Sequence, residues 1–303
     1  MTFKFKTAAT VAALAFGMAG TVVAADKRIA YTGFSTDNTF WIGVATAAAE
    51  EAERQGVEFI DMTASSPDAA AQKDAVDRAI DMGVDGIIIG SVDNRAFDAS
   101  LDKAASAGIA VVAVDTGIEH SHVSSLIQTD NLAAAGIAGE YIVEQLGGEG
   151  TVLILGGSAG HQTGNARRDG VKNAAEAAGH EVIFQICDWQ DACAFETTTN
   201  FLQSNPNIKA IFSAWDPGAL SAVSAAQALG KLEGLVIVGF DGNPANLVAI
   251  AEGEQTATIK QDNTQMGIRS VQSLLSVIDG KEAPALVPID GILIDSDNVA
   301  DFQ

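Results

Sequence analysis

The chain has 303 residues, of which 39 are acidic and 17 are basic, and its formal net charge at pH 7 is −22. A surface this acidic repels phosphate backbones and anionic head groups, which argues against nucleic acid and anionic membranes as partners. The length is more than one hydrophobic core usually supports, so we expect two domains.

The beginning of the chain has the features of an export signal. Two lysines precede the uncharged stretch 7–25, which ends in the small residues Val23-Ala24-Ala25. This pattern predicts a signal peptide over residues 1–25, cleaved near Ala24 or Ala25, and a mature protein in the periplasm. An uncleaved membrane anchor is the alternative, but the stretch barely reaches spanning length and is diluted by glycine, threonine and alanine.

After the signal, short runs rich in valine and isoleucine alternate with longer alanine-rich segments. The near-continuous apolarity of runs such as Gly86-Ile87-Ile88-Ile89 is typical of parallel strands covered by helices on both faces. Strands are predicted at 29–34, 57–63, 86–91, 110–114, 125–128, 151–155, 181–186, 210–214 and 235–240. Helices are predicted at 40–55, 69–82, 95–107, 132–146, 167–178, 192–204, 217–229, 244–252 and 264–279.

This alternation predicts an α/β fold, and so many strand–helix units do not fit comfortably in one sheet. An aspartate follows a predicted strand in each half of the chain, at Asp115 and at Asp241, which indicates a weak internal repeat. We therefore expect two doubly wound lobes, with the chain crossing between them more than once.

All three tryptophans lie just beyond predicted strands, each close to an acidic or amide residue. They are Trp41, Trp189 and Trp215. Ligands of open α/β sheets bind at the carboxyl ends of the strands. Flat rings can cover the C–H faces of a polyhydroxylated ligand, while carboxylates and amides hydrogen-bond with its hydroxyls. One such tryptophan would be assigned to the core, but three at equivalent positions favour a binding site.

Only two cysteines occur, Cys187 and Cys193, and they bracket Trp189. In an oxidising compartment we expect a local disulfide, which would add ~2 kcal/mol on the chain-entropy model and hold the Trp189 loop in place. Two free buried thiols are the alternative. No further cysteine or nearby histidine completes a zinc site.

Motifs for enzymatic and nucleotide chemistry are incomplete. Gly156-Gly157-Ser158-Ala159-Gly160 fits a nucleophile elbow, but the later histidines lie too close to the serine to complete a triad. No Walker loop occurs, no G-x-G-x-x-G opens the first strand–helix turn, and the four histidines form no metal-ligand motif. We therefore predict no catalytic residue, no cofactor and no metal site.

Several motifs follow one another in a specific order. They are Asn38-Thr39-Phe40-Trp41, Val84-Asp85-Gly86-Ile87-Ile88-Ile89, Thr129-Asp130-Asn131, Arg167-Arg168-Asp169-Gly170, Val238-Gly239-Phe240-Asp241-Gly242 and Ala257-Thr258-Ile259-Lys260-Gln261. In this order and spacing they resemble the sugar-binding periplasmic proteins of ABC importers, in particular the ribose-binding-like group with the type I periplasmic binding fold. The resemblance covers essentially the whole chain after the signal.

The resemblance implies two Rossmann-like lobes joined by a three-strand hinge, with the ligand held in the cleft between them. The lobes would comprise residues 26–129 plus 262–290 and residues 130–261 plus 291–303. The closed, loaded protein, a monomer, would dock on a membrane permease. The implied ligand-binding residues are Asn38, Phe40, Trp41, Asp115, Asn131, Asn165, Trp189, Trp215, Asp216, Asp241 and Gln261.

Departures from ribose binders bear on the ligand. Thr116 and Asn165 stand where those proteins have arginine, and Phe34 and Trp215 stand where they have a small polar residue and an amide. The aspartates of the set then lack obvious cationic neighbours, and Arg167 is expected to brace a helix start. We therefore expect a small neutral carbohydrate or polyol: a pentose, a sugar alcohol of four or five carbons, or a modified sugar.

The sequence leaves two other functions open. A loaded binding protein can signal to a chemoreceptor or to the ectodomain of a histidine kinase, and neighbouring genes for a permease or a kinase would separate these roles. An exported enzyme acting on sugars would need a paired acid and nucleophile, for which Asp115 and Asp241 could serve. Turnover of a bound sugar would identify such an enzyme.

Overall fold

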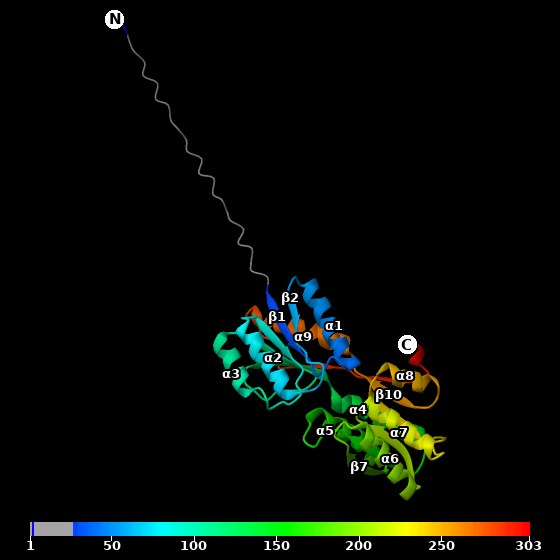
Figure 1. Cartoon of the computed structure of the whole chain (residues 1–303). Helices are drawn as coiled ribbons and strands as arrows, with labels where there is room; N and C mark the ends of the chain where they lie inside the picture. Colours follow the sequence, from blue (N-terminus) through cyan, green and yellow to red (C-terminus); the bar gives the residue numbers. More distant parts are fainter. Residues whose placement is uncertain (1, 3–26) are drawn as a thin grey trace.

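The computed structural model describes residue 2 and residues 27–303 (Figure 1). Nearly all of the predicted signal peptide, including both candidate cleavage residues, lies outside the described residues. The chain forms two α/β lobes, each built on a six-stranded sheet, so the expected fold is confirmed. Within residues 27–303 no helix is long and apolar enough to cross a membrane.

The first lobe has the strand order β11-β5-β4-β3-β1-β2, with every pair parallel. Its strands are β1 (Arg28–Thr32), β2 (Glu58–Asp61), β3 (Gly86–Ile89), β4 (Ala110–Val114), β5 (Val123–Thr129) and β11 (Leu286–Ile289). Its helices are α1 (Thr39–Arg54), α2 (Ala69–Asp81), α3 (Asp98–Ala107) and α9 (Asn263–Ile278). One core lies under α1 and α9 and another under α2 and α3, so both faces of the sheet are buried. Figure 1 shows α9 beside α1 although the two helices are far apart in the sequence.

The second lobe has the strand order β12-β10-β9-β8-β6-β7, and only β12 runs antiparallel to its neighbour. Its strands are β6 (Thr151–Gly156), β7 (Glu181–Ile186), β8 (Ile208–Ser213), β9 (Val236–Asp241), β10 (Ala257–Lys260) and β12 (Ile292–Asp295). Its helices are α4 (Asn131–Leu146), α5 (Gln162–Ala177), α6 (Asp191–Ser204), α7 (Asp216–Ala228), α8 (Pro244–Ala251) and the short 3-10 helix η1 (Val299–Phe302). Strand β6, which lies between β8 and β7, is buried along its whole length.

The chain passes between the lobes three times. The crossings lie between β5 and α4, between β10 and α9, and between β11 and β12. They supply the three-strand hinge that the resemblance implied. We propose that residues 26–129 plus 262–290 and residues 130–261 plus 291–303 move as the two rigid units.

The structure differs from the sequence-based prediction at the hinge strands and at α5. The strands β10, β11 and β12 have four residues each, and unlike the equally short β3 each contains a polar residue or a proline. Helix α5 begins at Gln162 rather than at residue 167. Farther along, the helix packs closely on α4, since a methyl group at Gly170 would lie 2.5 Å from the carbonyl oxygen of Leu132. Arg167 is consequently an interior residue of the helix.

Candidate functional site

A cavity of about 310 Å³ lies between the two lobes. It is lined from both sheets at the carboxyl ends of their strands, which is where open α/β folds place ligands. The wall combines aromatic rings with acids, amides, hydroxyls and an arginine. The lining residues are Phe34, Asn38, Phe40, Trp41, Asp115, Thr116, His161, Thr163, Arg167, Trp189, Asp191, Trp215, Pro217, Asp241 and Gln261.

Three rings of the first lobe form one wall of the cavity. Phe34 and Trp41 are stacked, with ring centroids 6.2 Å apart, and Phe40 meets Trp41 edge-on at 5.2 Å. Trp41 lies over Gly90, just after β3, where a Cβ would overlap the indole. Asn38 caps α1 by accepting a hydrogen bond from Phe40 N at 2.9 Å. The start of α1 therefore brings amide and rings to the cavity together.

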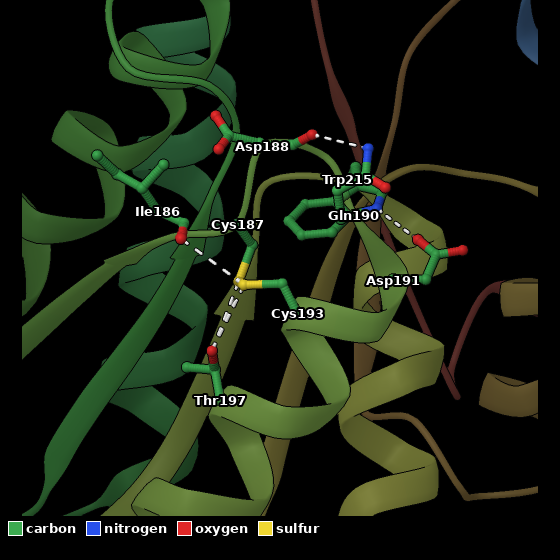
Figure 2. The surroundings of a disulfide bond; sticks show 8 residues. All are labelled: Ile186, Cys187, Asp188, Gln190, Asp191, Cys193, Thr197 and Trp215. Carbon is green, nitrogen blue, oxygen red and sulfur yellow. Dashed lines mark hydrogen bonds between the residues drawn. A yellow bond between two sulfur atoms is a disulfide. The ribbon is translucent and has the colours of Figure 1, made fainter.

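Rings of the second lobe form the opposite wall. Trp189 meets His161 edge-on at 5.2 Å and Trp215 edge-on at 5.8 Å. Trp189 lies over Gly157, just after β6, where a Cβ would overlap its ring. Trp215 Nε1 donates a hydrogen bond to Asp191 Oδ1 at 3.0 Å (Figure 2). All three tryptophans that the sequence placed near strand ends thus line one cavity.

The two cysteines are joined by a disulfide (Figure 2). Cys187 directly follows β7 and Cys193 lies in the first turn of α6, with their Cα atoms 5.3 Å apart. The link closes the loop that carries Trp189.

Arg167 supplies a permanent positive charge to the cavity. Its side chain is 5% exposed, and its guanidinium carbon lies 3.9 Å from the centroid of the Phe240 ring. Arg167 Nη1 lies 3.4 Å from Asp241 Oδ1, which also accepts a hydrogen bond from Gln261 Nε2 at 2.7 Å. The expectation that the aspartates lack a cationic neighbour, and that Arg167 only braces a helix start, is therefore wrong. The early start of α5 carries the guanidinium into the cleft.

Three carboxyl groups lie at or behind the wall of the cavity, of which Asp115 and Asp216 are buried and Asp241 is partly buried. Burial raises the pKa of Asp241 to about 6, although Arg167 and Gln261 lower it. Burial, reinforced by the charge of Asp241, raises the pKa of Asp216 to about 7. Burial also raises the pKa of Asp115, against the charge of Arg167. Hydrogen-bond donors from a ligand would stabilise the charged forms of those carboxyl groups that they reach.

The backbone is strained at this site. Among the described residues, the non-glycine residues with positive φ are Asp115 (64°), Asp188 (50°), Trp189 (60°) and Asp241 (135°). Each such conformation costs about 1–3 kcal/mol and persists only where the surrounding structure enforces it. Three of these residues line the cavity, and Asp188 precedes one of them. The strain is concentrated where side chains must be aimed into the cleft.

Two predicted amides lie outside the cavity lining. Asn131 is buried, donates to the carbonyl oxygen of Thr129 at 2.9 Å and accepts from Arg167 Nε at 2.8 Å. It therefore orients the arginine. Asn165 accepts a hydrogen bond from Arg168 Nη1 at 3.0 Å, on the side of α5 that does not line the cavity.

Asp216 also lies behind the cavity wall. Its side chain is fully buried and accepts hydrogen bonds from Thr258 Oγ1 and from Asn243 N, both at 2.6 Å. The second bond fixes the turn that follows Asp241. The N-cap position of α7 belongs to Trp215, and Asp216 is the first residue of the helix. Its carboxylate thus holds the neighbouring turn and does not line the cavity.

Other lining residues were not in the predicted set. His161 Nδ1 lies 2.9 Å from Thr163 Oγ1, and burial lowers the pKa of His161, which favours the neutral imidazole. The position of Asp191 between the two cysteines could have marked it as a candidate, whereas nothing in the local sequence marks the residues at the start of α5.

Among the described residues, no three histidine, cysteine or acidic side chains are grouped to hold a metal ion.

Known proteins resemble this chain in sequence and in fold. The family described as periplasmic binding protein domain matches residues 29–282. The ribose import binding protein of Escherichia coli is 28% identical over 288 residues, covering 95% of this chain and 96% of that protein. An ABC transporter periplasmic solute-binding protein of Actinobacillus succinogenes, solved with bound D-allose, is 26% identical with a TM-score of 0.84, covering 91% of this chain and 100% of that chain. A solute-binding protein of Mycobacterium smegmatis, solved with bound glycerol, is 27% identical with a TM-score of 0.83, covering 91% and 96% of the two chains.

Proposed function

The chain belongs to the periplasmic binding protein family, and on that basis we propose that it captures a small neutral sugar or sugar alcohol for an ABC importer. The two lobes close on the ligand, and the closed form delivers it to a membrane permease. Members compared above are described as binding proteins rather than enzymes. The fold and the sequence resemblance point to the ribose-binding-like group.

The observation that carries this proposal is the pairing of aromatic walls with buried carboxylates in one cavity. Trp41 and Trp189 come from opposite lobes and can cover the two C–H faces of a sugar. Asp115 and Asp241 can accept hydrogen bonds from hydroxyls, with Gln261 and Arg167 holding Asp241 in place. Leaving a buried hydroxyl unpaired costs about 1–3 kcal/mol, so the arrangement of these groups can select one stereoisomer.

The charge of the cavity favours a neutral ligand. One guanidinium faces several carboxyl groups, so a phosphate or carboxylate on the ligand would be repelled. The ligands named for the similar proteins are ribose, D-allose and glycerol, which are neutral and polyhydroxylated. Within that class we propose a pentose or a polyol of four or five carbons, because the added Phe34 ring narrows the site.

The closed form is stabilised by contacts that involve both lobes. Thr39 Oγ1, at the start of α1, donates to Asn243 Oδ1, at the start of α8, at 3.3 Å across the cleft. A ligand held by Asn38 and Trp41 on one side and by Trp189 on the other binds the closed form more tightly than the open form. That differential affinity shifts the hinge equilibrium toward closure.

Export precedes this cycle. We propose that residues 1–25 are removed near Ala24 or Ala25 and that the mature protein works in the periplasm as a monomer. Mass spectrometry of protein recovered from the periplasm would locate the new N-terminus.

A thermal-shift screen of the mature protein tests the proposed ligand class. The panel contains D-ribose, D-allose, glycerol, erythritol and ribitol, with sugar phosphates and amino acids as charged controls. A ligand present at 100 times its Kd stabilises the folded state by about 2.7 kcal/mol, which raises the Tm of a protein this size by roughly 5–10 °C. A shift with one or two neutral stereoisomers supports the proposal. A shift only with a charged control contradicts it.

A further inference from the structure

The loop between β7 and α6 carries one tryptophan of the cavity and contacts a second. Trp189 belongs to the loop, and Asp191, the first residue of α6, accepts the hydrogen bond from Trp215 Nε1 at 3.0 Å (Figure 2). The two indoles lie edge to face with their centroids 5.8 Å apart. A movement of this loop would therefore displace both rings.

The loop is held at both ends. The disulfide joins Cys187, which is buried in the core of the second lobe, to Cys193 in the first turn of α6. Gln190 N donates to the carbonyl oxygen of Cys187 at 2.8 Å and closes a turn. Between these anchors Asp188 and Trp189 both adopt the left-handed conformation, which non-glycine residues rarely adopt. An unanchored loop would relax to ordinary backbone angles and carry Trp189 away from the cavity.

From these contacts we propose that Asp191 and the Cys187–Cys193 disulfide are positioning groups of the binding site. The disulfide-closed loop positions the Trp189 indole through the loop backbone and the Trp215 indole through the Asp191 carboxylate. The expected effect on ligand affinity rests on the proposed function. The arrangement of the two indoles does not, because it exists in the ligand-free protein.

Circular dichroism of the sugar-free protein reports on the relative arrangement of the Trp189 and Trp215 indoles. Two indoles at this separation couple and give a pair of circular dichroism bands of opposite sign. Trp215→Phe removes one of the indoles and should abolish the pair, which identifies the bands. Asp191→Ala should abolish the pair, and Asp191→Asn should retain it, because an amide oxygen still accepts from Trp215 Nε1. Glu196→Ala is the matched control, since it removes an exposed acid from the same helix.

Opening the disulfide should have the same effect as Asp191→Ala. Dithiothreitol supplies two electrons and two protons, leaves Cys187 and Cys193 as thiols and becomes a cyclic disulfide itself. The double variant Cys187→Ser/Cys193→Ser repeats the test without reductant. A cooperative urea unfolding transition in every sample verifies that the lobes remain folded, and reoxidation should restore the band pair.

Calorimetric titration with D-ribose and D-allose completes the test. Where the wild type binds either sugar, Asp191→Ala and the reduced protein should bind about tenfold more weakly, and Asp191→Asn should bind nearly as well as the wild type. A band pair unchanged in both Asp191→Ala and the reduced protein would overturn the inference. If the wild type binds neither sugar, the titrations use the neutral compound that gives the largest thermal shift, and the band pair still tests the positioning role.

Discussion

Replacement of Asp241 by asparagine keeps the volume of the side chain and removes its charge. The carboxylate accepts a hydrogen bond from Gln261 Nε2 and lies 3.4 Å from Arg167 Nη1, so neighbours from two parts of the chain hold it in the cavity wall. A hydrogen bond to a charged group contributes about 1.5–3 kcal/mol, so losing one with the ligand should raise the Kd roughly 10- to 150-fold. Without ligand the charge is unfavourable, chiefly because burial removes it from water and also because Asp115 repels it. The free energy of unfolding of the sugar-free variant should therefore not fall.

Calorimetric titration and urea unfolding at pH 8 measure the two quantities on the same samples. The sugar is the one that gives the largest thermal shift with the wild type. Asp81→Asn is the control, because Asp81 is exposed at the end of α2, away from the cavity. An unchanged Kd for Asp241→Asn would refute the role of the carboxylate. A variant that loses affinity and stability together would show that Asp241 supports the fold instead.

Three further predictions concern pH, close packing and closure. If the ligand needs ionised Asp241, whose pKa is raised to about 6, titrations from pH 8 to pH 5 should show full affinity above that value and up to tenfold loss per pH unit below it. The stability of the sugar-free protein should depend on pH in the opposite direction, because folding raises the pKa of this carboxyl group. Its free energy of unfolding should increase as the pH falls from about 6 toward about 4, the pKa of aspartate in the unfolded chain, and urea unfolding measures this change. Gly157→Ala should displace Trp189 and weaken binding, whereas Gly136→Ala, at an open position in α4, should leave the Kd unchanged and slightly raise the Tm. Thr39→Ala removes a hydrogen bond between the lobes and should raise the Kd about 2- to 10-fold, chiefly through faster dissociation in stopped-flow measurements.

Much of the fold was predictable because apolar patterning is a local property. The run Gly86–Ile89 is buried on both faces, as a continuous apolar strand must be when helices cover both sides of a parallel sheet. The hinge strands lack such a pattern. β11 contains Pro288 and is only partly buried, and it exists because β5, remote in sequence, offers it a free edge. A four-residue segment of this kind is defined by its partner rather than by its own composition.

The aromatic part of the candidate site was predictable for a related reason. Parallel strands end at the same edge of a sheet, so residues just beyond several strands must converge. Trp41, Trp189 and Trp215 satisfy that condition and line one cavity. Their exact seating was not predictable, because it depends on glycines such as Gly90 and Gly157 that leave room for each ring.

The two-lobed α/β architecture, the convergence of tryptophans and aspartates at the strand ends, and the nearness of the two cysteines could all be predicted from local patterns in the chain. Which polar groups face the cavity depends instead on how the elements pack. Arg167 reaches Asp241 from a different element, 74 positions away in the chain, and Asp216 turns inward to hold a backbone turn. Strand and helix patterns arise from neighbouring residues, whereas the partner of a buried charge is set by how separate elements pack against one another.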